Sequence, residues 1–447
     1  MLREAITLVE QSGLAEVRRG KVGGLVVCGP NAEMVADALR NYLEHVTTDW
    51  EDMFATRLAL EELVLVIAAK RLSEEDIERV ESLICRFDQT EAPADFVRLQ
   101  LAYLQECLRI AANPCLSVFT LAMASLSVGR MAMHRPFERA LLKRAKQICS
   151  CRRDELRAVL AMDEGGALEA CHRHYAIFRE INQEAHSDLG QAEDPVDGGE
   201  EHSVLLTVKL GRPTMKRAEA VANQITARIV HGGLKPGDRL GSEVDLLAEY
   251  GVGRGVMREA IRILERQAIV KPLRGKRGGL HVVEPQPDMV VKTVAAYIRS
   301  LNVSHHDLVQ VGDTLDLLGA GMAAQRVRSQ PVTAEQLRER FAVLQTAAPL
   351  RDLSLAYYTL AGDLSGNRPL AALLSILPLM LADDETRHGD GSTLGSVDPD
   401  RLNSLFEAIA TGNVAQARRR MLILRRRGAR MRISSPPRTR LQEQAAV

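Results

Sequence analysis

The sequence predicts a mainly α-helical protein: a winged helix-turn-helix with a small β-wing, and two all-α helical bundle domains. Aromatic residues make up only 4% of the 447 residues, whereas hydrophobic residues make up 46%. Apolar residues recur at helical spacing through most of the chain, and short extended segments flank glycine-rich turns. This composition favours Ala- and Leu-rich helices over a β-sandwich.

Charge and cysteine content narrow the class of protein. Lys and Arg total 58, as do Asp and Glu, so any nucleic-acid-binding surface must be a local patch. The seven cysteines are an odd number, and the first residues are amphipathic and basic, unlike a secretory signal. We therefore expect reduced thiols and a cytoplasmic location. Since we find no stretch of about 18 uncharged apolar residues, we expect no membrane-spanning helix.

An internal repeat organises the chain. Residues 3–35 and 258–290 align without a gap at an offset of 255, and 15 of the 33 positions are identical. This predicts a duplicated two-domain unit. Met1 aligns with Val256, so the first copy begins inside a helix, through either a mis-assigned start or a true truncation. We expect a partial winged helix at 1–30, a helical domain at 31–186, a linker at 187–212, a complete winged helix at 213–285, a second helical domain at 286–428 and a basic tail at 429–447.

The order of elements in 213–285 is that of a winged helix-turn-helix. Apolar spacing and glycine stops predict helices near 215–231, 243–250 and 253–267. Two short strands are expected near 269–273 and 280–283, joined by a basic, glycine-rich turn.

The charge of this segment predicts that it binds double-stranded DNA. Eight basic and two acidic residues lie between Arg254 and Arg277. Four of these arginines, at 254, 258, 262 and 266, follow each other at i, i+4 steps, and such a stripe repels itself unless an anion neutralises it. A solvated charged face is the alternative explanation. The candidate DNA-binding residues are Arg254, Arg258 and Arg262 on the helix, and Arg274, Gly275, Lys276 and Arg277 in the wing.

The segment LKPGDRLGSEVDLLAEYGVGRGVMREAIRILERQAIVKPLRGKRGGLHVV, residues 234–283, resembles the DNA-binding domain of the GntR family. The resemblance implies that Arg254 and Arg258 contact bases or backbone in the major groove, and that residues 274–276 form a wing over the minor groove. Gly253 stands where the family usually has Ser or Thr, and Val244 where it often has Arg. These departures imply fewer phosphate contacts or a changed operator.

The two helix-only regions resemble the FCD effector-binding domain of the FadR branch of that family. The resemblance is carried by residues 57–61, 68–71 and 111–114 in the first region, and by residues 365–367 and 408–413 in the second. Many FCD domains bind a divalent metal through one Asp and three His. The corresponding positions here are Gln100, Leu104, Glu155 and Ile177, and in the second region Ser354, Tyr358, Leu402 and Leu424. A hydrophobic side chain is no metal ligand, so we expect neither a metal nor another cofactor.

Other polar residues of the first helical domain have competing interpretations. Arg57 is a candidate anchor for a carboxylate effector, and the alternative is an i, i+4 ion pair with Glu61. For His172 and His174 we expect surface or packing roles, because residues two apart on a helix point to different sides. Cys149 and Cys151 are candidate oxidant sensors, but thiols in apolar helices are usually inert packing.

The sequence lacks the constellations of an enzyme, such as a nucleophile elbow or a His-Glu-x-x-His zinc helix. We therefore expect a GntR-type DNA-binding transcriptional regulator that represses, with helical domains that dimerise and sense a small molecule, for example an organic acid. The chain would form a homodimer or an intrachain pseudo-dimer. The alternative is a degenerate paralogue that acts as a protein-interaction scaffold without specific DNA binding.

Overall fold

The structure is a computed structural model that describes most of the chain. The chain divides into two compact units, Met1–Val303 and Ser304–Val447. The described residues are 15–18, 24–27, 35, 38–40, 42–44, 49–89, 93–133, 135–188, 217–266, 269–273, 278–283, 287–301, 303–329, 339, 362–388 and 399–433. The expected linker at 187–212, apart from its first two residues, and the end of the expected basic tail lie outside this set.

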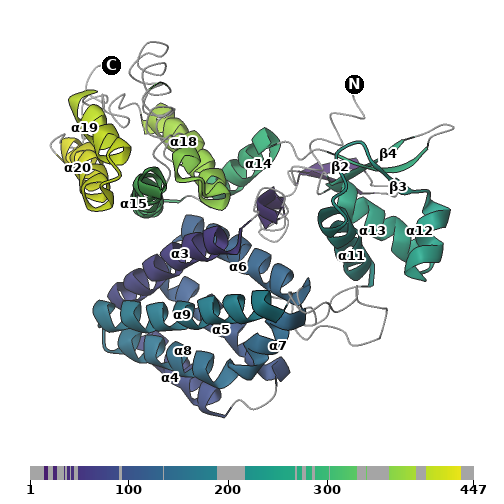
Figure 1. The fold of residues 1–447 in the computed structure, drawn as a ribbon, viewed down its shortest axis with the longest axis horizontal. Coiled ribbons are helices and arrows are strands. Elements are labelled where there is room, and N and C mark those ends of the chain that lie inside the picture. The colour runs from purple at the N-terminus through teal and green to yellow at the C-terminus, as the bar shows by residue number, and fades with distance from the viewer. Residues whose placement is uncertain are drawn as a thin grey trace, which may run out of the picture. The chain divides into compact units, whose positions relative to one another are not determined.

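Among the described residues, seven helices form the first helical domain (Figure 1). They are α3 (Trp50–Arg71), α4 (Glu74–Asp88), α5 (Pro93–Ala111), α6 (Pro114–Met133), α7 (Arg135–Lys143), α8 (Ala145–Leu160) and α9 (Glu164–Asp188). Helix α3 is central, since it packs against α5, α6, α8 and α9. Because it is covered on several sides, its polar residues Arg57 and Glu61 are buried with the apolar ones.

The apolar spacing of residues 136–162 predicts one helix, but the structure has two, α7 and α8, separated at Arg144. The backbone N–H of Arg144 is shared between the carbonyls of Ala140 and Leu141, at 3.3 and 3.1 Å, and its own carbonyl starts α8. The side chain of Arg144 pairs with Glu184 on α9. The break lets α7 turn and bury Phe137 against the rings of Trp50 and Phe178.

One described helix, α6, is long and apolar enough over Pro114–Met131 to cross a membrane by length and composition. This window contains Arg130, so it is not an uncharged stretch of the kind sought in the sequence. In the structure 61% of that window is buried inside the protein, as in the core helix of a bundle.

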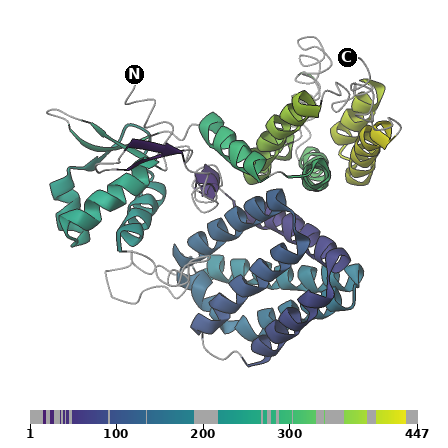
Figure 2. The same ribbon diagram turned by 180° about the vertical axis from the view of Figure 1, so that it is seen from behind.

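The winged helix contains three helices and a three-stranded antiparallel sheet (Figures 1 and 2). The helices are α11 (Arg217–His231), α12 (Glu243–Tyr250) and α13 (Arg254–Arg266), and the strands are β3 (Arg239–Gly241), β4 (Val270–Leu273) and β5 (Gly279–Val282). The sheet order is β3-β5-β4. All predicted elements of this domain are confirmed, with boundaries within two residues.

A second β-ribbon lies near the N-terminus. Strands β1 (Ala15–Arg18) and β2 (Gly24–Val27) are antiparallel, with Ala15 opposite Val27. Each strand lies 255 positions before its counterpart, β4 or β5, in which Val270 is opposite Val282. The ribbon thus recurs at the offset found in the sequence. The helix expected to precede it lies outside the described residues.

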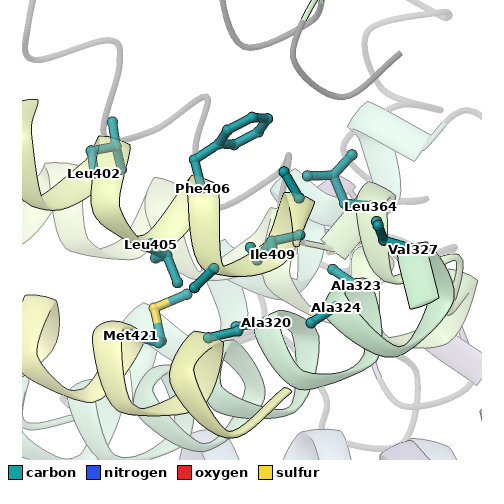
Figure 3. Close-up of a cluster of buried hydrophobic side chains, with 13 residues drawn as sticks. Ala320, Ala323, Ala324, Val327, Leu364, Leu402, Leu405, Phe406, Ile409 and Met421 are labelled. Carbon is teal, nitrogen blue, oxygen red and sulfur yellow. The ribbon is translucent and has the colours of Figure 1, made fainter. Parts of the chain in front are cut away.

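The second unit contains α15 (His305–Ser329), α18 (Arg368–His388), α19 (Pro399–Ala410) and α20 (Val414–Ile433), and α14 (Pro287–Ser300) precedes them. We call α15, α18, α19 and α20 the second helical region. Its apolar core gathers small residues of α15, such as Ala320 and Ala324, against Leu405, Ile409 and Met421 (Figure 3). Helix α20 runs past the boundary expected at 428 and ends at Ile433, so the first part of the expected tail is helical.

Candidate functional site

The helix-turn-helix is fixed by local capping. The Ser242 side chain accepts a hydrogen bond from the backbone N–H of Asp245 at 3.2 Å, and the Asp245 carboxylate accepts one from the backbone N–H of Ser242 at 2.7 Å. This capping box begins α12. Gly251 ends it with a φ of +57°, a conformation that favours glycine. Two residues later the Gly253 carbonyl accepts from Met257 and begins α13.

Helix α13 has one buried and one charged face. Met257, Ala260 and Leu264 are fully buried in the core of the domain. Arg254, Arg258 and Arg262 are exposed, as the i, i+4 spacing predicted. The arginine stripe is therefore an accessible cationic surface directly after a tight turn.

The three arginines differ in their partners. Arg258 Nε lies 2.9 Å from Glu243 Oε1, and Arg262 Nη1 lies 3.4 Å from Glu259 Oε2. Both pairs are solvent-exposed and therefore weak. For Arg254 the described residues contain no ion pair or hydrogen-bond partner. Its guanidinium is thus available to an anion without breaking a contact, whereas an anion at Arg258 must compete with Glu243.

The base of the wing is held by a close backbone approach. A Cβ on Gly279 would lie 2.6 Å from the carbonyl oxygen of Gly241, so β5 meets β3 only with glycine there. Arg239 Nε, on β3, donates to the Gly278 carbonyl at 3.0 Å and so holds the start of β5 against β3. The predicted wing residues Arg274, Gly275, Lys276 and Arg277 lie outside the described residues. Lys271, on the strand leading to them, is exposed.

A second polar cluster lies inside the first helical domain. It consists of Arg57 and Glu61 on α3 with Arg152 and Glu155 on α8, and we call it the ionic centre. Arg57 Nε lies 2.8 Å from Glu61 Oε1, Arg152 Nη2 lies 3.0 Å from Glu61 Oε2, and Arg152 Nη1 lies 2.8 Å from Glu155 Oε2. The Arg152 and Glu155 side chains are 3% and 0% exposed. The formal charges of two guanidinium and two carboxylate groups thus cancel in the core of the domain.

Helix α5 contributes neutral partners to this centre. The Tyr103 hydroxyl donates to Glu155, and the Arg152 guanidinium lies over the Tyr103 ring, 4.3 Å from its centroid. Arg152 Nε donates to Gln100 Oε1 at 3.2 Å. Arg152 therefore links α3, α5 and α8 through one side chain.

The surroundings shift the two carboxyl groups in opposite directions. Burial by itself raises the pKa of Glu61, but Arg57 and Arg152 outweigh it and lower that pKa to about 2. For Glu155 burial dominates over its contact with Arg152, so its pKa is raised. Burial and the nearby Arg152 and Arg57 hold the pKa of His174 well below its usual range, so His174 is neutral.

Several buried polar atoms beside the ionic centre have no hydrogen-bond partner among the described residues. These atoms are Glu155 Oε1, both ring nitrogens of His174, the Tyr175 hydroxyl and Gln100 Nε2. His174 is 1% exposed and packs edge-on against Tyr175 and Phe178. His172 by contrast is exposed and pairs with Glu62. The predicted packing and surface roles of the two histidines are both confirmed.

The residues that meet at this centre do not fit the metal of the FCD resemblance. Gln100 contacts Arg152, and Glu155 Oε1 lies 4.0 Å from His174 Nδ1, whereas Ile177 is half-buried outside the cluster. The converging set therefore has a guanidinium in place of a third ligand. No group of three or more His, Cys, Asp or Glu side chains that would hold a metal ion is found in the part of the chain that the structure describes.

The structure also bears on Arg57 and the thiols. Arg57 is buried and makes the ion pair with Glu61 that was the alternative to an effector-binding role. Burial raises the pKa of Cys149 to about 11 and also raises that of Cys151, so both are protonated thiols inside the bundle. Sequence reasoning missed Arg152 and Tyr103. The available signal was an Arg and a Glu three residues apart on the otherwise apolar face of α8.

Comparison with known proteins gives matches to both domains that hold these residues. Residues 217–282 match the family model described as bacterial regulatory proteins, gntR family, and residues 52–177 match the FCD domain. Two parts of the chain are thus similar to a gntR-family DNA-binding domain and to an FCD domain. The curated relatives that match the chain are transcriptional regulators by name.

Curated relatives cover parts of the chain. RmpR of Mycobacterium gastri, an HTH-type transcriptional regulator by name, is 30% identical over 30% of this chain and 48% of its own length. The mannosyl-D-glycerate transport/metabolism system repressor MngR of Escherichia coli is 33% identical over 20% of this chain and 35% of its own length. The HTH-type transcriptional regulator LutR of Bacillus subtilis is 26% identical over 43% of this chain and 91% of its own length. The chain thus spans about half of the length of RmpR and about a third of the length of MngR.

A solved structure, Streptococcus agalactiae GntR, aligns over 48% of this chain and 99% of its own. The identity is 21% and the TM-score 0.33, so this likeness carries no argument.

Proposed function

We propose that this chain is a DNA-binding transcriptional regulator that represses. It reads double-stranded DNA with α13, and the adjacent wing residues 274–277 contribute further contacts. The observation that carries the proposal is the row of three exposed arginines on the outer face of α13, placed after a capped tight turn in a gntR-family domain. Arginine's planar fork matches guanine edges and phosphates.

The remaining parts have supporting roles in this proposal. The helical domains, placed at 31–186 and 286–428, dimerise and respond to a small molecule, and the protein acts in the cytoplasm. Repression is supported by the name of one relative, the repressor MngR. A homodimer supplies two complete winged helices for a two-half-site operator, whereas an intrachain pseudo-dimer still supplies only one.

Binding to DNA from the protein's own upstream region tests the proposal. Fluorescence anisotropy over a salt series compares the wild-type chain with Arg254→Ala/Arg258→Ala. Each good contact to a base is worth about 1–3 kcal/mol, so the loss of two contacts should lower the affinity by roughly 30-fold to 20,000-fold. The salt slope should also become shallower, because fewer phosphate counterions are released.

A variant with the same change in charge is the control. Arg98→Ala/Arg173→Ala removes two exposed arginines from the first helical domain, where their partners are nearby surface acids. It should bind the specific duplex like the wild type. If wild type and both double variants bind specific and scrambled duplexes equally weakly, the DNA-binding proposal fails. The alternative, a protein-interaction scaffold, then takes its place.

Repression itself requires a cellular test. A reporter driven by the upstream region should increase in expression when the gene is deleted, and should return to its low level when the wild-type gene is restored. The Arg254→Ala/Arg258→Ala variant should not restore it. A fall in reporter expression on deletion would show an activator.

A further inference from the structure

The strongest feature outside the winged helix is the ionic centre, because it occupies the place where the FCD resemblance expects a metal ion. Two of its neighbours, Gln100 and His174, converge on it from α5 and α9. A metal ion in such a position would link helices through a positive charge. In this chain Arg152 makes that link, with contacts to Glu61 on α3, Gln100 and Tyr103 on α5, and Glu155 on its own helix.

We propose that Arg152 takes the place of the metal ion, and that Glu155 takes the place of a bound acid, so that the first helical domain carries its own ligand. The inference limits the sensing role given above, because in this domain Glu155 would occupy the position of a free organic acid. It concerns the stability of the domain and does not depend on DNA binding, so it stands or falls separately from the regulator proposal.

Charge balance is the first argument. Arg57 and Arg152 face Glu61 and Glu155, so the four formal charges cancel without an external ion. An uncompensated buried guanidinium would attract an anion strongly, but here every cation has a carboxylate within 3.0 Å. A free organic acid would therefore have to displace Glu155 or Glu61 before it reached either arginine.

The donor set is the second argument. A divalent ion at this point would lie beside the Arg152 guanidinium, which is positively charged and has no lone pair to offer. Leu104, at another position of the resemblance, is buried and apolar. The oxygens of Glu61 and Gln100 already accept hydrogen bonds from the two arginines. This leaves Glu155 Oε1 and His174, which are too few to replace the hydration shell of the ion. The positive charge of Arg152 and the small number of available ligand atoms both exclude a metal ion.

Chemical rescue tests the inference directly. Glu155→Ala removes a carboxylate and leaves the Arg152 guanidinium beside a space of matching size. The sole tryptophan, Trp50, is stacked on Phe137 at 4.9 Å in the first helical domain and reports its unfolding within the full chain. The variant should lower the midpoint of this fluorescence transition by roughly 6–20 °C. Sodium acetate should then raise it by roughly 5 °C or more beyond sodium chloride of equal ionic strength.

Three comparisons make the rescue specific. Acetamide, which has the shape of acetate without its charge, should not rescue Glu155→Ala. Acetate should not raise the midpoint of the wild-type chain beyond sodium chloride. It should also leave Glu169→Ala unchanged, a variant that removes an exposed carboxylate paired with Arg173 on α9. If Glu155→Ala folds and acetate acts on it no differently from chloride, the inference is overturned. It is also overturned if acetate stabilises the wild type equally.

A metal measurement on the unmodified chain decides the matter even if Glu155→Ala fails to fold. The chain is incubated with Zn²⁺, Ni²⁺ or Mn²⁺, desalted and analysed for metal. We expect the Trp50 midpoint to be the same after metal loading and after EDTA. One bound ion per chain together with a higher Trp50 midpoint that EDTA reverses would overturn the inference.

Discussion

The first helical domain and the second helical region share turns but differ in what they bury. In the first, Ala112 and Met162 have left-handed φ values of +47° and +54°, and in the second Gly366 and Gly412 have +74° and +68°. Each is followed by a residue that caps the next helix. Asn113 Oδ1 accepts from the Leu116 N–H at 3.0 Å, and the corresponding acceptors are Asp163, Asn367 and Asn413.

These turns show which residues of the first helical domain correspond to which residues of the second helical region. Gly412 lies 250 positions after Met162, and the same offset places Leu402 opposite Arg152 and Leu424 opposite His174. The correspondence of these two leucines with Glu155 and Ile177 that was expected from the sequence is therefore wrong by three residues. Leu402 belongs to the apolar core of the second region, and Leu424 packs against it. The same turn geometry thus occurs with a charge-balanced ionic centre in the first domain and with an apolar core in the second region. The framework is specified by caps and left-handed residues, and the chemistry of the interior is specified independently.

The largest expected effect comes from replacing Arg152 with leucine, the residue type that Leu402 has at the corresponding position of the second region. Arg152→Leu leaves Glu61 with only Arg57 and leaves Glu155 buried without a cation, which should cost about 3–5 kcal/mol of unfolding free energy. Urea unfolding followed by Trp50 fluorescence measures it. Arg173→Leu, on exposed α9 surface, should cost less than about 1 kcal/mol.

The double variant Arg152→Leu/Glu155→Leu sharpens the test. It removes one cation and one anion and leaves the Arg57–Glu61 pair intact, so it should recover most of the stability lost in the single variant. A double variant as unstable as Arg152→Leu would show that lost packing, and not charge imbalance, separates the two regions.

The next effect is a pH dependence that an apolar centre would not have. The pKa of Glu61 is lowered from 4.5 to about 2, so its contribution is present above pH 4.5 and is lost as the pH falls toward 2, by about 3 kcal/mol. The pKa of Glu155 is raised, so its contribution is present below pH 4.5 and is lost as the pH rises through the raised value. Stability should therefore rise slightly as the pH falls from 7 and then decline below 4.5.

Glu155→Gln separates the two carboxyl groups. The amide cannot ionise, so the rise on the acid side of neutrality should vanish while the decline below pH 4.5 persists. Urea midpoints from Trp50 between pH 3 and 7 provide both curves. A wild-type profile that is flat from pH 7 to pH 3 would contradict the assignment of opposite shifts.

Prediction from sequence succeeded where the signal is local and failed where it is tertiary. The helices and strands of the winged helix follow from glycine stops, caps and apolar spacing, and the outward face of Arg254, Arg258 and Arg262 follows from their i, i+4 register. The partner of Arg57 was among the open alternatives because it lies one turn away on the same helix. Arg152 has a local partner in Glu155, but its link to α3 was missed because Glu61 is 91 residues distant and no local pattern connects them. The break at Arg144 likewise depends on contacts with α9.

The smallest effect concerns the shared turns. The left-handed conformation costs Ala112 about 1–2 kcal/mol, a cost that Gly366 does not have. A glycine, however, lowers stability by about 0.4–1 kcal/mol, because it gives the unfolded chain more conformational entropy. Ala112→Gly should therefore stabilise the first helical domain by about 0.5–1 kcal/mol in Trp50-monitored urea unfolding. The same exchange at Ala158, inside helix α8, should destabilise it by about 1 kcal/mol, since no left-handed strain is relieved there. Opposite signs at the two positions would establish that the turn is a conformational requirement shared with the second region, and equal signs would refute it.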